Sequence, residues 1–192
     1  YLADGSVIKL RTNLVGAKYT LAVPDYLWEQ GLKDFADIAR FRKELGASIY
    51  GIEPGNDGNG LVLGLIKANR FGLGGFKLVE SSEQGMLAQV ERAVRAKGPI
   101  VFLAWAPHPM NTHYPIKYLT GGDDTFGPDY GAATVNTLVR KGYVEQCPNL
   151  GRLLQNLEFD VDLENGFMDR ILSDKLSAAD LAKEWVAKRP DR

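Results

Sequence analysis

The sequence contains no apolar run near the roughly 20 residues that a membrane-spanning helix needs, so we expect none of it to cross a bilayer. It also lacks an excess of charge of either sign, because 23 basic residues face 24 acidic ones, for a formal net charge of −1. This balance gives no electrostatic reason to bind nucleic acid or an anionic membrane surface. With 45% hydrophobic and 24% charged residues among 192, the composition is that of a globular protein with a core.

Histidine and cysteine, two common zinc ligands, are scarce. His108 and His113 lie five residues apart in a loop broken by proline, without a third ligand nearby, so we expect no metal and no cofactor. The single cysteine, Cys147, leaves two interpretations open. It is either a small buried apolar residue or one half of a disulfide whose partner lies outside this sequence.

Strand and helix patterns alternate over the first 105 residues. Runs of β-forming residues are separated by segments whose apolar residues recur at helical spacing. This β-α-β order predicts an α/β fold with a parallel sheet and helices on its faces. The predicted strands are 18–23, 48–53, 76–80 and 100–105, and the predicted helices are 33–45, 59–69 and 86–97, the last preceded by a capping box of Ser81 and Gln84.

The pattern changes near residue 120. A Gly- and Asp-rich loop is followed by a β-like stretch, ATVNTLVRKGY, and then by helical spacing around 150–157, 161–173 and 177–188. We therefore expect two parts: residues 1–120 form a nearly complete α/β lobe, and residues 121–192 form a mostly helical, partial lobe.

Three polar or aromatic residues fall where ligands of open α/β sheets bind, beyond the carboxyl ends of strands. Tyr19 lies in the first strand, Asn56 in the loop after the second, and Trp105 at the end of the fourth. Taken singly, such aromatics are more often core residues, and an asparagine in a Gly-rich loop is more often a turn residue. An indole fixed at a strand end nevertheless suits a quaternary ammonium, which aromatic faces attract by about 0.5–2 kcal/mol per contact.

A different class of protein, an α/β enzyme, would use His108, Asp123 or Asp124 as acid or base. In a Gly-rich crossover the two aspartates are more simply solvated turn residues. The sequence also has no nucleophile elbow and no Cys/His pair, so we predict no catalysis. Trp28 and Trp185 are expected to be packing residues.

Six stretches occur together in one order: AKYTLA, IYGIEPGNDGN, ESSEQGMLAQV, VFLAWAPHPM, YLTGGDDTFGP and CPNLGRLLQNL. This set resembles the choline-binding branch of the glycine betaine/choline substrate-binding proteins of ATP-binding-cassette (ABC) importers, over essentially the whole chain. The resemblance implies a two-lobed periplasmic-binding-protein fold of type II, with one lobe nearly complete and the other partial. It further implies a trimethylammonium ligand held in an aromatic cage between the lobes.

The resemblance also implies roles for individual residues. Tyr19 and Trp105 match cage walls, and Asn56 matches the amide that hydrogen-bonds the ligand's hydroxyl or other polar end. Asp57 and His108 are expected to support these contacts without touching the ligand. Ala106 departs from the pattern, because relatives of this branch often carry a glutamate there.

The implied function is capture of choline for an importer, with glycine betaine as the alternative ligand and the membrane permease as the partner. The resemblance implies a periplasmic or otherwise extracytoplasmic, membrane-anchored protein that is monomeric at full length. Because the sequence opens on Tyr1 without a signal peptide, we expect an upstream segment. That segment is expected to carry the other cage aromatics, an acidic residue facing the cation and the disulfide partner of Cys147.

Overall fold

The computed structural model describes residues 1–188, and the chain divides into two compact units. The sheet unit comprises Lys18–Ala106 and Met110–Ala132. The helical unit comprises Tyr1–Ala17, Pro107–Pro109 and the chain from Ala133 onward. The predicted division at residue 120 therefore falls inside the sheet unit. Each unit is assembled from separate chain segments, which a single change of composition along the sequence cannot reveal.

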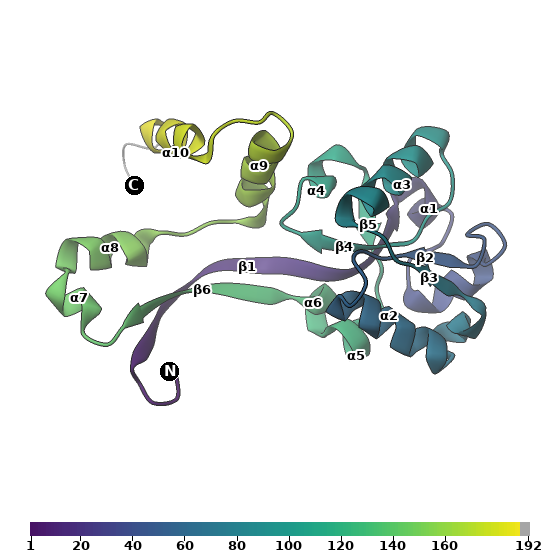
Figure 1. Cartoon of the computed structure of the whole chain (residues 1–192), viewed down its shortest axis with the longest axis horizontal. Coiled ribbons are helices and arrows are strands. Elements are labelled where there is room, and N and C mark those ends of the chain that lie inside the picture. Colours follow the sequence, from purple (N-terminus) through teal and green to yellow (C-terminus); the bar gives the residue numbers. More distant parts are fainter. Residues whose placement is uncertain (189–192) are drawn as a thin grey trace. The chain divides into compact units, whose positions relative to one another are not determined.

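The sheet unit is built on strands β1 to β5 in the order β3-β2-β4-β1-β5 (Figure 1). β2 is parallel to β3 and β4, but β1 is antiparallel to β4 and β5. The prediction of a parallel sheet was therefore wrong for β1, because an apolar pattern identifies a strand but not its direction. The strands are β1 (Val7–Pro24), β2 (Ser48–Tyr50), β3 (Lys77–Val79), β4 (Phe102–Ala106) and β5 (Ile116–Tyr118).

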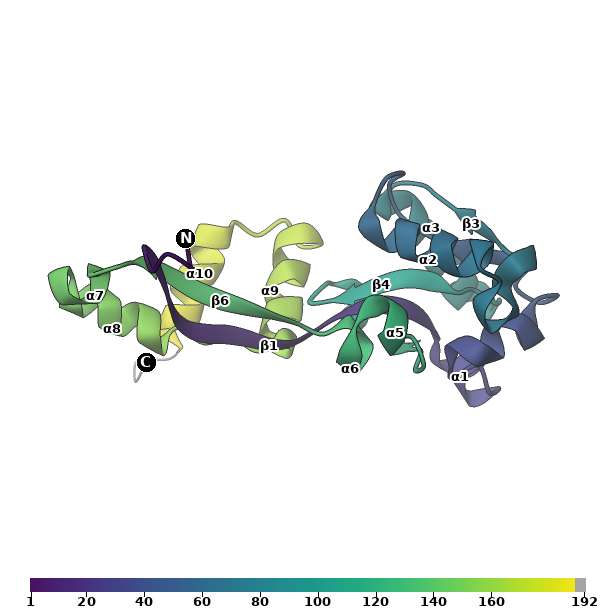
Figure 2. The same ribbon diagram turned by 90° about the horizontal axis from the view of Figure 1, so that it is seen from below.

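Helices α2 (Asp57–Lys67) and α3 (Glu83–Ala96) lie on one side of β4, and α1 (Asp25–Glu29) lies on the other (Figure 2). α3 is capped by Ser82, whose hydroxyl accepts a 3.0 Å hydrogen bond from the Gly85 N–H, one residue later than predicted. The expected helix 33–45 is shorter and of the 3₁₀ type. The remaining helical segments are η1 (Phe35–Phe41), η2 (Arg70–Gly75), α4 (Met110–His113), α5 (Asp123–Phe126) and α6 (Pro128–Gly131).

The core of the sheet unit lies between the strands and these helices. Its largest side chains have lost essentially all contact with solvent, which supplies the main favourable free energy of folding. Trp28 is half-buried against this core, as expected for a packing residue. The fully buried side chains include Leu21, Val23, Leu32, Phe35, Ile38, Ile49, Leu73, Met86, Phe102 and Leu103.

The helical unit contains β6 (Ala133–Arg140), which pairs antiparallel with the Val7–Ala17 part of β1 (Figure 1). Helices follow where helical spacing predicted them. Trp185 contacts the rings of Phe159 and Phe167, both at 6.2 Å between centroids, so it is a packing residue as predicted. No helix within residues 1–188 is both long and apolar enough to span a membrane. The helices are α7 (Tyr143–Gln146), α8 (Pro148–Asn156), α9 (Val161–Leu172) and α10 (Ala178–Ala187).

Candidate functional site

Tyr19 and Trp105 are direct partners on neighbouring antiparallel strands, β1 and β4. Side chains of directly opposed residues point to the same face of a sheet, with Cβ atoms about 4.5–5.5 Å apart. The structure therefore brings the two predicted aromatics together, although not for the predicted reason. Trp105 is at the carboxyl end of β4, whereas Tyr19 reaches this edge because β1 runs in the opposite direction and enters the sheet unit there.

Asn56 joins this pair through its side-chain oxygen. It is the N-cap of α2, where its Oδ1 accepts hydrogen bonds from the N–H groups of Gly58 (2.8 Å) and Asn59 (3.4 Å). The hydroxyl of Tyr19 donates to the same oxygen at 2.7 Å. These backbone donors fix which way the amide faces. Within residues 1–188 its Nδ2 donates to no protein group, so two N–H donors are available to a ligand.

Two residues that the sequence did not single out hold the Tyr19 ring in place. Phe126 and Tyr19 make a T-shaped ring contact, with centroids 6.3 Å apart. Gly58 lies directly under the phenol, and a Cβ at this position would overlap the Tyr19 hydroxyl and come within 2.8 Å of Leu103. Burial raises the pKa of Tyr19, and its hydrogen bonds with Gly58 and Asn56 oppose this rise. At neutral pH its hydroxyl is therefore a protonated donor.

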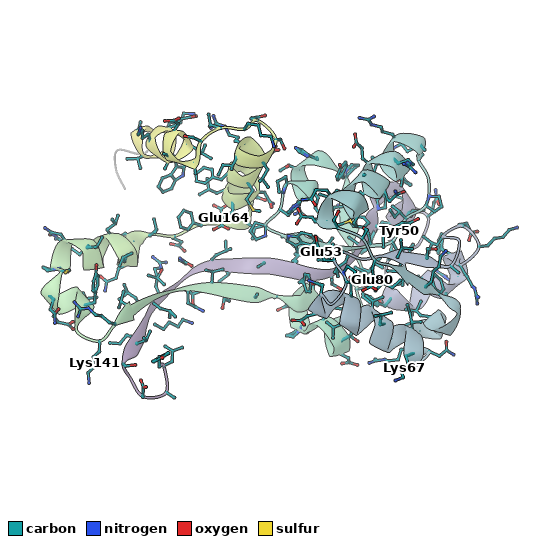
Figure 3. The ribbon with its side chains drawn as sticks, in the orientation of Figure 1. Tyr50, Glu53, Lys67, Glu80, Lys141 and Glu164 are labelled. Atoms are coloured by element: carbon teal, nitrogen blue, oxygen red, sulfur yellow. The ribbon has the colours of Figure 1, made fainter. Side chains whose placement is uncertain are left out.

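The loop that presents Asn56 is fastened by a buried asparagine. Asn59 accepts a hydrogen bond from the N–H of Ile52 (3.1 Å) and donates to the Ile52 carbonyl and to Glu80, each at 3.0 Å. Glu53 in turn accepts from the N–H of Glu83 at 2.9 Å, at the start of α3. Figure 3 shows Glu53 and Glu80 close to this loop. These contacts tie the β2–α2 loop to the start of α3 and so fix the cap residue.

The two expected supporting residues lie in different units. Asp57 is the exposed first residue of α2, next to Asn56, and its charge contributes to the raised pKa of Tyr19. His108 is buried in the helical unit, where its N–H donates to Asn165 Oδ1 at 2.7 Å. That His108 supports the ligand contacts stays a prediction.

The residues of the enzyme alternative are divided between the two units, because Asp123 and Asp124 belong to the sheet unit and His108 to the helical unit. Asp123 and Asp124 are exposed on α5, and Asp124 faces Arg70 at 3.5 Å. No group of three or more candidate metal ligands occurs among residues 1–188. Cys147 is half-buried, and the chain has no second cysteine with which to pair it. Its predicted disulfide to an upstream segment stays a prediction.

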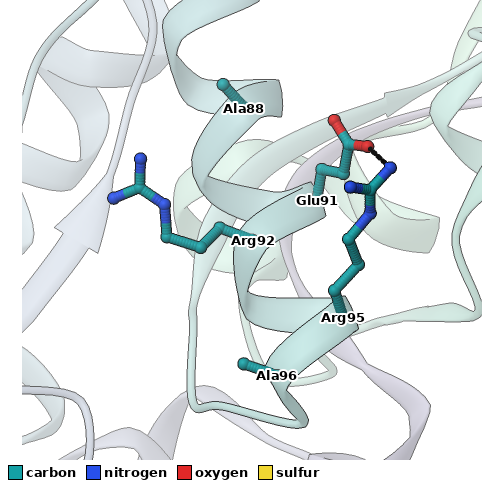
Figure 4. Close-up of a pocket in the computed structure, with 5 residues that line it drawn as sticks. All are labelled: Ala88, Glu91, Arg92, Arg95 and Ala96. Atoms are coloured by element: carbon teal, nitrogen blue, oxygen red, sulfur yellow. Dashed lines mark ion pairs between the residues drawn. The ribbon is translucent and has the colours of Figure 1, made fainter.

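Two surface hollows belong to the sheet unit. One, of about 450 Å³, includes Asn56 and Asp57 in its lining, at the start of α2. The other, of about 460 Å³, lies along α3 and is lined by Ala88, Glu91, Arg92, Arg95 and Ala96 (Figure 4). It contains no aromatic side chain, and its Glu91 and Arg95 already pair with one another at 2.5 Å. The α3 hollow therefore lacks the groups that attract a quaternary ammonium.

Solved structures with the same fold include two binding proteins above 25% identity. An ABC-transporter choline-binding protein in complex with choline is 54% identical, with a TM-score of 0.76, over 99% of this chain and 66% of that one. Lactococcal OpuAC complexed with glycine betaine is 28% identical, with a TM-score of 0.72, over 96% of this chain and 68% of that one. These matches confirm the periplasmic-binding-protein-like fold.

Among curated proteins, the glycine betaine/carnitine transport binding protein GbuC of Listeria monocytogenes is 29% identical over 155 residues. The match covers 79% of this chain but only 50% of GbuC, so the chain spans about half the length of this relative. A family model described as the substrate-binding domain of the ABC-type glycine betaine transport system matches residues 1–188. This family consists of binding proteins and not of enzymes. The chain therefore belongs to the substrate-binding domains of ABC-type glycine betaine transport systems.

Proposed function

We propose that this chain binds choline, or a closely related trimethylammonium solute, and performs no chemistry on it. The observation that carries the proposal is the Tyr19–Trp105 pair on one face of the sheet, with Asn56 hydrogen-bonded to the Tyr19 hydroxyl. Two aromatic faces beside one amide provide what such a ligand needs. The rings attract the methylated cation, and the amide binds its polar end.

The polar end of the ligand must present a hydrogen-bond acceptor. Because Asn56 Oδ1 already accepts from Tyr19, Gly58 and Asn59, only its Nδ2 remains to meet a ligand. The hydroxyl oxygen of choline and the carboxylate of glycine betaine both satisfy an N–H donor. Choline is favoured because the choline-bound relative is 54% identical, against 28% for the relative complexed with glycine betaine.

We further propose that the other walls of the cage belong to the part of the relatives that this chain does not cover. The chain spans 66% of the choline-bound structure. In this proposal the sheet unit is one lobe of a binding protein, and the helical unit is part of the other. The full-length protein would act in the periplasm, or anchored to the membrane in another extracytoplasmic compartment, as a monomer that delivers the ligand to the permease of an ABC importer.

Titration calorimetry with choline, glycine betaine and ethanolamine tests the proposed ligand. Choline should bind and change tryptophan fluorescence, and ethanolamine should compete poorly, because a primary ammonium retains its water and gains less from an aromatic face. Ethanolamine that competes as well as choline would show that the site recognises the hydroxyl rather than the methyl groups.

The wall assignment is tested by substitution at Trp105. Trp105→Ala should weaken choline binding by about 1–2 kcal/mol, and Trp105→Phe by less, since it keeps an aromatic face. Trp185→Phe, in the helical unit among Phe159 and Phe167, is the matched control and should leave binding unchanged. A folded Trp105→Ala variant with wild-type affinity would remove Trp105 from the site.

A further inference from the structure

The strand that carries Trp105 ends one residue later, at Ala106. β2 pairs with β4 at Phe102, three residues before Trp105, and the β1–β4 pairing ends at Lys18 and Ala106. Pro107 follows directly and cannot donate to a ladder. An aromatic wall at such a position needs further contacts to keep a single orientation.

A side chain from α4 supplies one such contact. The Nδ2 of Asn111 donates to the carbonyl oxygen of Trp105 at 2.9 Å. The Oδ1 of the same amide accepts a 2.7 Å hydrogen bond from the hydroxyl of Tyr118 on β5. The amide of Asn111 therefore bridges Tyr118 and the backbone of Trp105, and each of its two ends has a defined partner.

Tyr118 is itself held on the face of the sheet opposite Tyr19 and Trp105. It pairs with Ala22 on β1, and Lys18, four residues earlier on the same strand, points to that same face. The ammonium of Lys18 lies over the ring of Tyr118 (5.2 Å to its centroid) and over that of Tyr130 (4.9 Å). Burial raises the pKa of Tyr118, which keeps its hydroxyl protonated and able to donate.

We propose that Asn111 and Tyr118 are positioning residues that hold Trp105 in its ligand-binding orientation, with Lys18 fixing the Tyr118 ring from the back of the sheet. This inference rests on the proposed function, in which Trp105 is an aromatic wall that contacts the ligand. The two aromatics of the site lie on one face, and the Lys18–Tyr118–Asn111 relay reaches the Trp105 backbone from the other. The relay touches no part of the ligand and acts only through Trp105.

The test uses the 192-residue chain with Trp28→Phe and Trp185→Phe, so that Trp105 is the only tryptophan. Its fluorescence anisotropy reports the mobility of the indole with or without ligand, and choline titration reports binding. Asn111→Leu and Tyr118→Phe should both lower the anisotropy. Asn111→Leu should weaken choline binding about five- to tenfold and Tyr118→Phe about two- to threefold, as expected for lost hydrogen bonds. Tyr114→Phe removes a hydroxyl four residues away and should stay within about twofold of the parent.

The double variant Asn111→Leu/Tyr118→Phe separates a relay from two independent structural effects. If Tyr118 acts through Asn111, the double variant should match Asn111→Leu alone, whereas independent losses would add. Lys18→Met should lower the anisotropy as Tyr118→Phe does, and Lys18→Arg, which keeps the cation over the rings, should restore it. Thermal melts verify that each variant is folded.

The outcomes distinguish this inference from the proposed function. Lower anisotropy in Asn111→Leu with non-additive double-variant behaviour supports the relay, even if no variant and no parent binds choline, in which case only the proposed function fails. Unchanged anisotropy in a folded Asn111→Leu variant, or additive losses, would overturn the relay while leaving choline binding by the parent intact.

Discussion

The amide of Asn56 carries two tasks that lie on different atoms. Its oxygen caps α2 and accepts from Tyr19, and in the proposed function its nitrogen donates to the ligand. Aspartate caps a helix as well as asparagine does, so Asn56→Asp preserves the first task and abolishes the second. This separation makes the residue a means of distinguishing the two candidate ligands.

Asn56→Asp should therefore weaken binding of glycine betaine more than binding of choline. The new carboxylate repels the carboxylate of betaine, whereas the hydroxyl of choline can donate to it. We expect glycine betaine to lose at least tenfold in affinity, about 1.4 kcal/mol, and choline to lose only a few-fold. Calorimetry with both ligands measures the difference, and equal losses for the two would contradict a ligand contact through Nδ2.

Gly58 allows Tyr19 to lie against the N-terminus of α2, because a Cβ here would overlap the Tyr19 hydroxyl. Gly58→Ala should displace the phenol, break its bond to Asn56 and cost about 1–3 kcal/mol of stability through overpacking. Gly64→Ala, on the same helix with open space around it, is the matched control and should stabilise by about 0.5–1 kcal/mol. Chemical denaturation measures the free energy of unfolding of both variants. Equal stability of the two would mean that Tyr19 moves aside without loss of stability.

The candidate site could be predicted from the sequence only in part. Tyr19, Asn56 and Trp105 stand in stretches specific enough to suggest a family, and the structure brings them together. The contact of Gly58 could not be predicted, because it is made with Tyr19, which is distant in the sequence. The contact of Asn111 could not be predicted, because the direction of the turn that precedes it was unknown. Asn111 sits within the VFLAWAPHPMN stretch, but its reach back to the Trp105 carbonyl depends on how α4 turns.

At the scale of whole elements, capping residues and apolar spacing predicted the position of a helix where the helix depends only on its own residues. The N-caps Asp160 and Ser177 start α9 and α10 at or beside the predicted positions. Strand direction was not accessible, because β1 pairs with β4, β5 and β6, all distant in the sequence. The conclusion that Tyr19 lies beside Trp105 therefore required the antiparallel register as well as the strand pattern.

The contact between α9 and α10 should depend on pH. Glu184 accepts from Arg170 at 2.8 Å and from Lys188 at 2.6 Å, and these partners lower the pKa of Glu184 to about 2. Because the pKa of Glu184 is lower in the folded state, its ionised carboxylate stabilises that state at pH values above the ordinary pKa of the carboxyl. This stabilisation is lost as the pH falls toward about 2. Amide protection of the two helices should therefore fall on acidification below about pH 4.5.

Glu184→Gln should remove this acid dependence and give slightly lower protection at neutral pH. Because the pair is exposed, the effect should be small, so hydrogen exchange resolved by helix is the suitable measurement. Glu91→Gln is the matched control, since its partner Arg95 lies one turn away on α3 and joins no second helix. Equal acid sensitivity in wild type and Glu184→Gln would assign the effect to other carboxylates.

At the scale of the whole molecule, the two units differ in how completely they cover their apolar side chains. The sheet unit encloses a continuous core, whereas the helical unit leaves large apolar residues in solvent, among them Val15 (63% exposed), Leu138 (50%) and Leu153 (57%). The sequence places leucines at helical spacing around 150–157, in the region of α8. It could not predict the exposure of β1 and β6, because their pairing was unknown.

We predict that the chain self-associates through these side chains, because exposed apolar groups that gather into patches favour association. Light scattering over a concentration series should show oligomers, and Leu138→Lys with Leu153→Lys should shift them toward monomer. Leu63→Lys, at a similarly exposed leucine on α2, is the control and should leave the association unchanged. Association that persists in the double variant would place the contact elsewhere.

We predict that this chain binds choline more weakly than the choline-bound relative does. If the remaining cage walls belong to the third of the choline-bound relative that this chain does not cover, the cation stays partly hydrated and loses aromatic contacts. We expect binding at least about tenfold weaker than in that relative, a difference of about 1.4 kcal/mol or more. Calorimetry on both proteins in one buffer measures it. Equal affinity would mean that Tyr19, Asn56 and Trp105 lie in a site complete within these 192 residues.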